Sequence, residues 1–167
     1  MTLRVRRGGV EVARDSSIWL GARNRRGTYL PELLNERLAG DEIATCVPVA
    51  LEVLTGPADA AELDRNWETV WQRLRWLPVG EQATARALEL LRQLARTAAG
   101  AHRRRPIDYL VAACAEQAGG DVVLWHWDRD LTAICEVAGI PHEPEHERAK
   151  AAGIDAGPGE ARGSRRS

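Results

Sequence analysis

The sequence predicts an α/β fold in which a parallel sheet is covered by helices on both faces. Short apolar or alternating segments recur along the chain, and longer segments with apolar residues at helical spacing separate them. Strands that alternate with helices favour parallel pairing, because each helix carries the chain back to the start of the sheet. The length of 167 residues suits a single domain with a sizeable core.

The predicted strands are short and bounded by polar residues or glycine. The first alternates apolar and polar residues shortly before Asp15, and the third is a continuous apolar run, as expected of a strand buried on both faces. The segments are GGVEVA (8–13), EIATC (42–46), DVVLW (121–125) and IPHE (140–143). We therefore expect a central sheet of four to five short strands.

The remaining periodic segments are predicted to be helices, several with a proline near the start or a glycine at the end. They cover residues 17–22, 30–40, 47–56, 58–77, 81–100, 107–120 and 130–139. The apolar stripe of the longest early helix consists of Leu63, Trp67, Val70, Trp71 and Leu74. We expect this helix and the next one to form a helical hairpin with Trp67 and Trp71 in its core.

Three parts are expected along the chain: an N-terminal leader (1–9), one folded domain (10–143) and a polar C-terminal segment (144–167). The last part lacks aromatic residues and has few large apolar ones, so it is predicted to be disordered.

Composition narrows the class of protein. The formal net charge is −1, so any contact with nucleic acid must come from local basic patches. We expect no membrane span, because no run approaches roughly 18 apolar residues, and no secretory signal, because the basic N-terminus has no apolar stretch behind it. Three scattered cysteines without a CxxC pair favour a reducing cytoplasm.

Acidic residues follow or precede several predicted strands. Asp15 follows the first strand, Glu52 lies in the helix after the second, and Asp108 begins the helix before the third. Each also has a structural interpretation: Asp15 as a helix cap, Asp108 as a first-turn acid that complements the helix dipole, and Glu52 as a solvent-facing residue. The ends of parallel strands are nevertheless where ligands bind in such sheets.

Asp128 and Asp130 lie beyond the third strand, in VVLWHWDRDL. Because DLTAI is a good helix start, we expect Asp130 to be the N-cap, which leaves Asp128 as the better candidate ligand. Carboxylates gathered in a cleft repel one another, and a divalent cation offsets that cost. Mg²⁺ prefers oxygen ligands and promotes hydrolysis of phosphate esters. Neighbouring His126 is interpreted as hydrogen-bonded rather than as a catalytic base.

The same residues resemble the motifs of PIN domains. DSSIWL (15–20) is similar to the first motif, and ATCVPVALEVLTG (44–56) is similar to the second, with Glu52 in place. The segment RPIDYLVAACAEQAGGDVVLWHWDRDL (105–131) resembles the third and fourth motifs, with Asp108 and Asp128 at the acidic positions. Their order and spacing, over about residues 10–143, look like those of VapC-type toxins of bacterial toxin–antitoxin modules.

The resemblance implies a PIN-like three-layer α/β/α sandwich and a Mg²⁺- or Mn²⁺-dependent endoribonuclease that acts on structured RNA such as tRNA or rRNA. It also implies inhibition by a cognate VapB-type antitoxin and a homodimer. The implied metal ligands are Asp15, Glu52, Asp108 and Asp128. Ser17 and Asp130 would support the site.

Arg14 departs from the family pattern, because a cation directly before Asp15 competes with a metal unless strand alternation turns it away. Loss of metal binding would leave a catalytically impaired PIN-like domain that binds RNA or protein, and this alternative stays open. A phosphoacceptor of the receiver type would also gather aspartates at strand ends, but it needs a lysine near the last strands. The only lysine, Lys150, lies in the polar C-terminal segment, so this class is set aside.

Two basic clusters are candidates for RNA binding. Arginine forks suit phosphate oxygens, although a solvated loop explains such clusters equally well. The candidate residues are Arg103, Arg104, Arg105, Arg25 and Arg26.

Overall fold

The computed structural model describes residues 11–24, 29–40, 43–98, 100–119 and 122–153. The predicted α/β architecture is confirmed. The strands are β1 (Glu11–Arg14), β2 (Ile43–Cys46), β3 (Arg75–Leu77), β4 (Val122–His126) and β5 (His142–Pro144). The helices are α1 (Ser16–Asn24), α2 (Leu30–Ala39), α3 (Val47–Leu54), α4 (Ala60–Thr69), α5 (Glu81–Thr97), α6 (Pro106–Gln117), α7 (Arg129–Ala138) and α8 (Glu145–Ala151), with a 3₁₀ turn at Trp71–Arg73.

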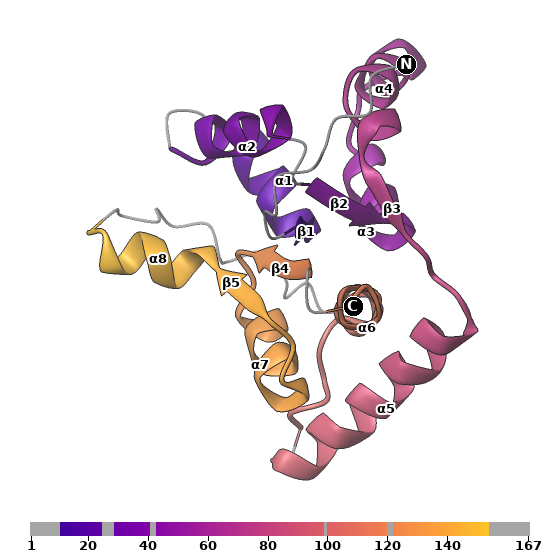
Figure 1. Cartoon of the computed structure of the whole chain (residues 1–167), viewed down its shortest axis with the longest axis vertical. Helices are drawn as coiled ribbons and strands as arrows, with labels where there is room; N and C mark the ends of the chain where they lie inside the picture. The colour runs from indigo at the N-terminus through magenta and orange to yellow at the C-terminus, as the bar shows by residue number, and fades with distance from the viewer. Residues whose placement is uncertain (1–10, 25–28, 41–42, 99, 120–121, 154–167) are drawn as a thin grey trace, which may run out of the picture.

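The described strands form one parallel sheet in the order β3-β2-β1-β4-β5. The first described strand, β1, is the middle one; the chain then forms one half of the sheet through β2 and β3 and crosses to β4 and β5 on the other side of β1. Helices α1 and α2 lie on one side of the sheet, and α6 and α7 lie on the other (Figure 1). Because strand order reverses at β1, the carboxyl ends of β1 and β4 form the switch point at which α/β sheets bind ligands.

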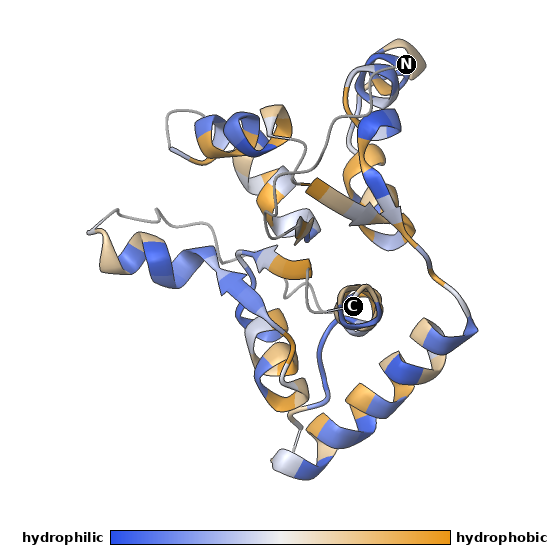
Figure 2. Cartoon of the chain, in the orientation of Figure 1, coloured by the Kyte–Doolittle hydropathy of each residue, from blue (hydrophilic) through white to orange (hydrophobic). Residues whose placement is uncertain are grey.

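Helix α5 forms an outer layer against α6 (Figure 1). Hydrophobic and hydrophilic residues alternate along it (Figure 2), as expected of a helix with one buried face. Its buried residues are Ala83, Ala87, Leu90 and Leu94, which recur at intervals of three or four. This layer supports α6, the helix that carries Asp108.

The structure corrects the predicted helix over residues 58–77. Helix α4 ends at Thr69, and β3 pairs with β2 at the sheet edge, so a strand separates α4 from α5 where a simple helical hairpin was expected. Trp71 is buried and stacks on Trp19 with ring centroids 4.9 Å apart, whereas Trp67 stays 36% exposed. Trp71 and Leu74 of the predicted stripe are buried, but they lie in the 3₁₀ turn and directly after it. Leu77 is buried from β3, because pairing with β2 outweighs the local helical periodicity.

The segment expected to be a disordered tail begins with structure. Residues Glu145–Ala151 form α8, and Glu145 is buried. Its carboxylate accepts hydrogen bonds from the Tyr29 hydroxyl (2.5 Å) and from Nε1–H of Trp125 (2.7 Å). These bonds hold α8 against the sheet. The rest of the predicted tail (154–167) and the predicted leader (1–9) lie outside the described residues. No helix in the described ranges is both long and apolar enough to cross a membrane.

Candidate functional site

Asp15 lies at the end of the central strand. Its backbone N–H donates to the carbonyl of Trp125 at 3.1 Å, so β1 and β4 stay paired up to this residue. The carboxylate is buried, and Oδ2 accepts from the N–H of Ser17 at 2.9 Å. Oγ of Ser17 accepts from the N–H of Trp127 at 2.8 Å, which ties the start of α1 to the chain beyond β4. The fold therefore fixes Asp15 at the switch point.

Glu52 joins Asp15 through a serine that sequence reasoning did not select. The hydroxyl of Ser16 donates to Oε2 of Glu52 at 2.6 Å and lies 3.4 Å from Oδ1 of Asp15. Glu52 also forms an ion pair with Arg105. Its side chain therefore faces the site and not open solvent. The repeated hydroxyl in Asp15-Ser16-Ser17 was the available signal, but only the fold shows which serine reaches Glu52.

Asp108 is the most perturbed acid of the group. It is buried near the start of α6, and its Oδ2 has no hydrogen-bond partner among the described residues. Burial raises the pKa of Asp108 to about 7; the charge of Arg105 opposes this, and the negative charges of Asp15, Asp128 and Asp130 add to it. The carboxyl groups therefore lie close enough to repel one another, as the sequence predicted.

The cap of α7 differs from the prediction. Asp128, not Asp130, is the N-cap residue, and its Oδ1 accepts from the N–H of Asp130 at 2.7 Å. The helix begins at Arg129, and its N-cap lies two residues earlier than expected, which places Asp130 in the first turn. There Asp130 forms an ion pair with Arg104. Because Oδ1 of Asp128 accepts the capping hydrogen bond, Oδ2 is the oxygen left to bind a metal ion.

Arg14 does not compete for the acidic group. It is 1% exposed, and its guanidinium lies over Trp125 at 4.6 Å and near Trp19 at 5.4 Å from the ring centroids. Burial lowers the pKa of Arg14 to about 8, with a further contribution from the charge of Arg37. Its nitrogens have no hydrogen-bond partner within the described ranges. Strand alternation turns it away from Asp15, so this departure leaves the site intact.

The basic residues divide into three groups. Arg104 and Arg105 pair with Asp130 and Glu52, whereas Arg103 is exposed beside them. Arg25 and Arg26 lie outside the described residues. The structure therefore places one predicted cluster directly at the acidic group.

His126 takes no part in the acidic group. It is fully buried, and its Nε2 lies 3.1 Å from Nδ1 of His142. Burial lowers the pKa of His126 to about 3, so the ring is neutral at physiological pH. A buried ring of this kind is poorly placed to exchange protons with a substrate.

The chemistry of the acidic group suits a divalent cation, but its oxygens are farther apart than a bound ion would hold them, because the described residues contain no three carboxylates with oxygens within 4.8 Å of one another. The unpartnered, buried Oδ2 of Asp108 and its raised pKa indicate negative charge that is only partly compensated by arginines. Oxygen donors of this kind match the preference of Mg²⁺ and Mn²⁺. Candidate donors are the carboxylates of Asp15, Glu52, Asp108 and Asp128.

Comparison with known proteins gives a family. The PIN domain model matches residues 13–137. Ribonuclease VapC18 of Mycobacterium tuberculosis (strain ATCC 25618 / H37Rv) is 32% identical over 132 residues, which cover 77% of this chain and 90% of the relative.

Two solved structures share the fold. A DNA-bound VapBC from Salmonella typhimurium superposes with a TM-score of 0.57 at 19% identity, covering 80% of this chain and 97% of that one. FitAcB from Neisseria gonorrhoeae gives 0.53 at 15% identity, covering 81% and 99%. With the match to the family model and the identity to a VapC ribonuclease, the chain belongs to the VapC-type PIN-domain family.

Proposed function

We propose that the chain is the toxin of a toxin–antitoxin pair, a cytoplasmic endoribonuclease that depends on Mg²⁺ or Mn²⁺. The convergence of Asp15, Glu52, Asp108 and Asp128 at the switch point of the sheet carries this proposal, because such a cluster is costly without a cation. The identity to a ribonuclease supports the activity.

Each part of the chain has a role in this proposal. The four carboxylates would hold the ion, with Ser16 and Ser17 fixing Glu52 and Asp15 through the hydrogen bonds described above. When bound, a divalent ion supplies positive charge at the phosphate and lowers the pKa of attacking water. Arg103, Arg104 and Arg105 lie beside the acidic group and would bind the RNA backbone, with Arg25 and Arg26 assigned to the same role from sequence alone.

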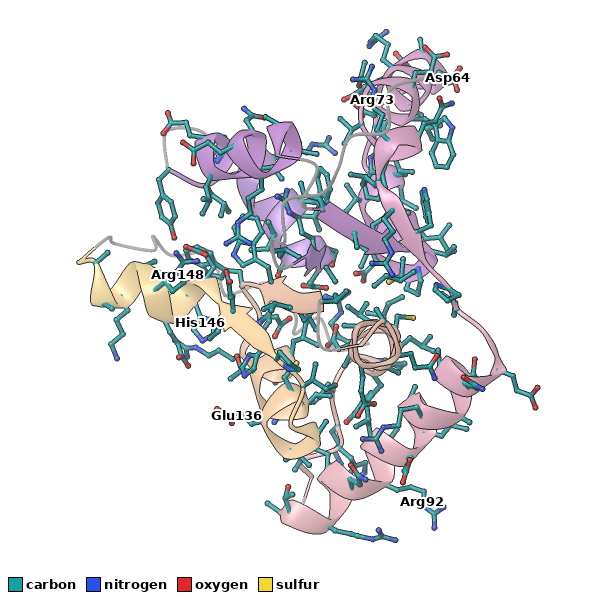
Figure 3. All side chains as sticks on the ribbon, viewed as in Figure 1. Asp64, Arg73, Arg92, Glu136, His146 and Arg148 are labelled. Atoms are coloured by element: carbon teal, nitrogen blue, oxygen red, sulfur yellow. The ribbon has the colours of Figure 1, made fainter. Side chains whose placement is uncertain are left out.

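A test compares cleavage of tRNA and rRNA by the wild type, Asp15→Asn and Asp108→Asn in Mg²⁺, Mn²⁺ and EDTA. Both variants are expected to lose at least about 100-fold in rate, because even supporting groups around metals contribute 10- to 100-fold. Asp64→Asn is the matched control, since Asp64 is exposed on α4, far from the acidic group (Figure 3). Unaltered circular dichroism would show that the variants fold.

One result would instead favour a catalytically impaired binding domain. Glu52 and Asp130 are each paired with an arginine, so the site could bind RNA without holding a cation. A wild type that binds RNA but cuts none with any divalent ion would establish that alternative. Growth arrest on expression of the wild type, absent with Asp108→Asn, would support the toxin.

The proposed partners are a VapB-type antitoxin and a second copy of the chain. The similar Salmonella structure is a VapBC assembly. Large apolar residues stay exposed on two helices: Val47 and Leu51 on α3, and Leu63 and Trp67 on α4. Exposed apolar clusters of this kind are typical of interfaces. Leu51→Asp should weaken co-purification with the antitoxin or shift the protein to a monomer on size-exclusion chromatography.

A further inference from the structure

A second group of metal-binding side chains lies beside the acidic group and shares no residue with it. His126, Cys135 and His142 come from the consecutive elements β4, α7 and β5. One ligand atom from each residue lies within 4.8 Å of the other two. Nothing in the proposed ribonuclease mechanism uses these three side chains.

The sheet and its covering helix bring the three residues together. His142 pairs in register with Leu124, two residues before His126, so the two histidines project from the same face of the sheet. Their rings stack with centroids 5.4 Å apart and an interplanar angle of 11°. Helix α7 packs against β5 on that face and contributes Cys135.

Burial makes this cluster unusual for a set of polar groups. His126 and Cys135 are both 0% exposed, and His142 is partly buried. Within the described residues, Nδ1 of His126 has no hydrogen-bond partner. A single contact between two imidazoles therefore satisfies little of the polar capacity in this region.

We propose that His126, Cys135 and His142 form a zinc site distinct from the carboxylate site. Thiolate and imidazole suit zinc, whereas Mg²⁺ prefers oxygen, so the two sites select different ions. Two nitrogens bound to a tetrahedral zinc ion are about 3.3 Å apart, given Zn–N bonds of about 2.0–2.1 Å. The observed 3.1 Å between Nε2 of His126 and Nδ1 of His142 is close to this separation.

The fourth ligand of a tetrahedral zinc ion at this site would be water or His146. The His146 ring centroid lies 6.4 Å from that of His126, and its Nδ1 is buried without a partner in the described part of the chain. Figure 3 shows His146 on the side of α8 that faces α7, opposite Arg148. A partly buried His142 gives the ion a route from solvent.

Zinc binding exchanges a proton for the ion. Burial raises the pKa of Cys135 to about 12, so its thiol is protonated in the metal-free chain. On binding, the Sγ–H bond breaks, the proton passes to solvent and the thiolate electron pair forms the Zn–S bond. The ion would then link β4, α7 and β5, the elements on either side of Asp128. Its role is structural support for that end of the acidic group.

The test is a titration of the full chain with Co²⁺ as a spectroscopic substitute for zinc, followed by Zn²⁺, with Mg²⁺ in large excess. We expect one equivalent of cobalt to give a thiolate-to-cobalt charge-transfer band and the visible bands of tetrahedral cobalt, and zinc to abolish both. Cys135→Ala should lose the bands. Cys114→Ala removes another buried thiol and should keep them.

Two more variants keep the result interpretable. His142→Ala changes a partly exposed residue and should weaken zinc binding by at least about 100-fold if it removes a direct ligand. Asp15→Asn combined with Asp108→Asn should keep the cobalt bands, since the carboxylates are not part of this site. The proposal fails if the wild type shows no thiolate band, or if Cys135→Ala or His142→Ala binds zinc as tightly as the wild type does.

Discussion

Replacement of Asp108 by asparagine in the metal-free protein measures the electrostatic cost of the acidic group. Asp108 is buried, and its pKa rises from 3.8 to about 7. Because the folded state holds this proton more tightly than the unfolded chain does, the contribution of Asp108 to stability is largest at low pH. That contribution is lost as the pH rises from about 4 through about 7. Asparagine is uncharged and removes the dependence.

The structure sets the size of the effect. One pKa unit corresponds to about 1.4 kcal/mol, so a shift from 3.8 to about 7 amounts to up to about 4 kcal/mol in the free energy of unfolding. Between pH 5 and pH 8 the same two pKa values predict that Asp108→Asn gains about 2–3 kcal/mol over the wild type. Saturating Mg²⁺ should shrink the gain, because the ion favours the charged carboxylate.

Urea unfolding in EDTA, at four pH values from 5 to 8, measures this difference for the two proteins. Asp64→Asn serves again as the control, because it removes an exposed carboxylate and leaves Asp108 in place. If the difference between Asp108→Asn and the wild type is flat across the series, then Asp108 is not the buried, repelled acid described here. The metal-site argument would lose its main support.

Three further substitutions test other contacts. Ser16→Ala removes the 2.6 Å hydrogen bond to Glu52 and should lower the RNA cleavage rate about 10-fold while leaving the circular dichroism unaltered; an unaffected rate would contradict a positioning role. Trp125→Phe removes the Nε1–H donor of buried Glu145 and should cost about 1–3 kcal/mol in urea unfolding. Arg14→Met removes a buried guanidinium without hydrogen-bond partners among the described residues. The free energy of unfolding, measured by thermal denaturation, should therefore fall by no more than about 1 kcal/mol. A larger loss would mean that the buried cation stabilises the fold.

The sequence predicted the sheet and the position of its acids for one physical reason. Parallel strands end at a common edge, so residues that follow different strands meet there however far apart they are in the chain. Asp15 and Glu52 are 37 positions apart and share the hydroxyl of Ser16. The apolar pattern of β4 and the alternation of β1 were sufficient to define that edge.

The sequence did not predict the N-cap of α7, strand β3 or the group of two histidines and a cysteine. In the first two cases the local sequence is compatible with either of two structures. Asp128 and Asp130 are both good N-caps, and the first turn of α7 selected Asp128. Residues 71–77 have helical periodicity, yet Leu77 is buried from a strand, because the edge of β2 was open for pairing. The His126, Cys135 and His142 group follows no recognisable spacing, so only the register of β4 with β5 shows it.

In the proposed catalytic site, arginines neutralise part of the negative charge of the acids. These ion pairs are compatible with a bound cation. Arg105 pairs with Glu52, and its charge opposes the rise in the pKa of Asp108, so it acts as a partial counter-charge for both residues. Its side chain is 49% exposed, and such half-exposed pairs are worth only about 0–1 kcal/mol. Little free energy is therefore needed to break the Arg105–Glu52 pair. Leaving the buried Oδ2 of Asp108 without a hydrogen-bond partner or ion, in contrast, destabilises the fold. Once released from Glu52, the guanidinium would be free to bind a phosphate oxygen beside the acidic group.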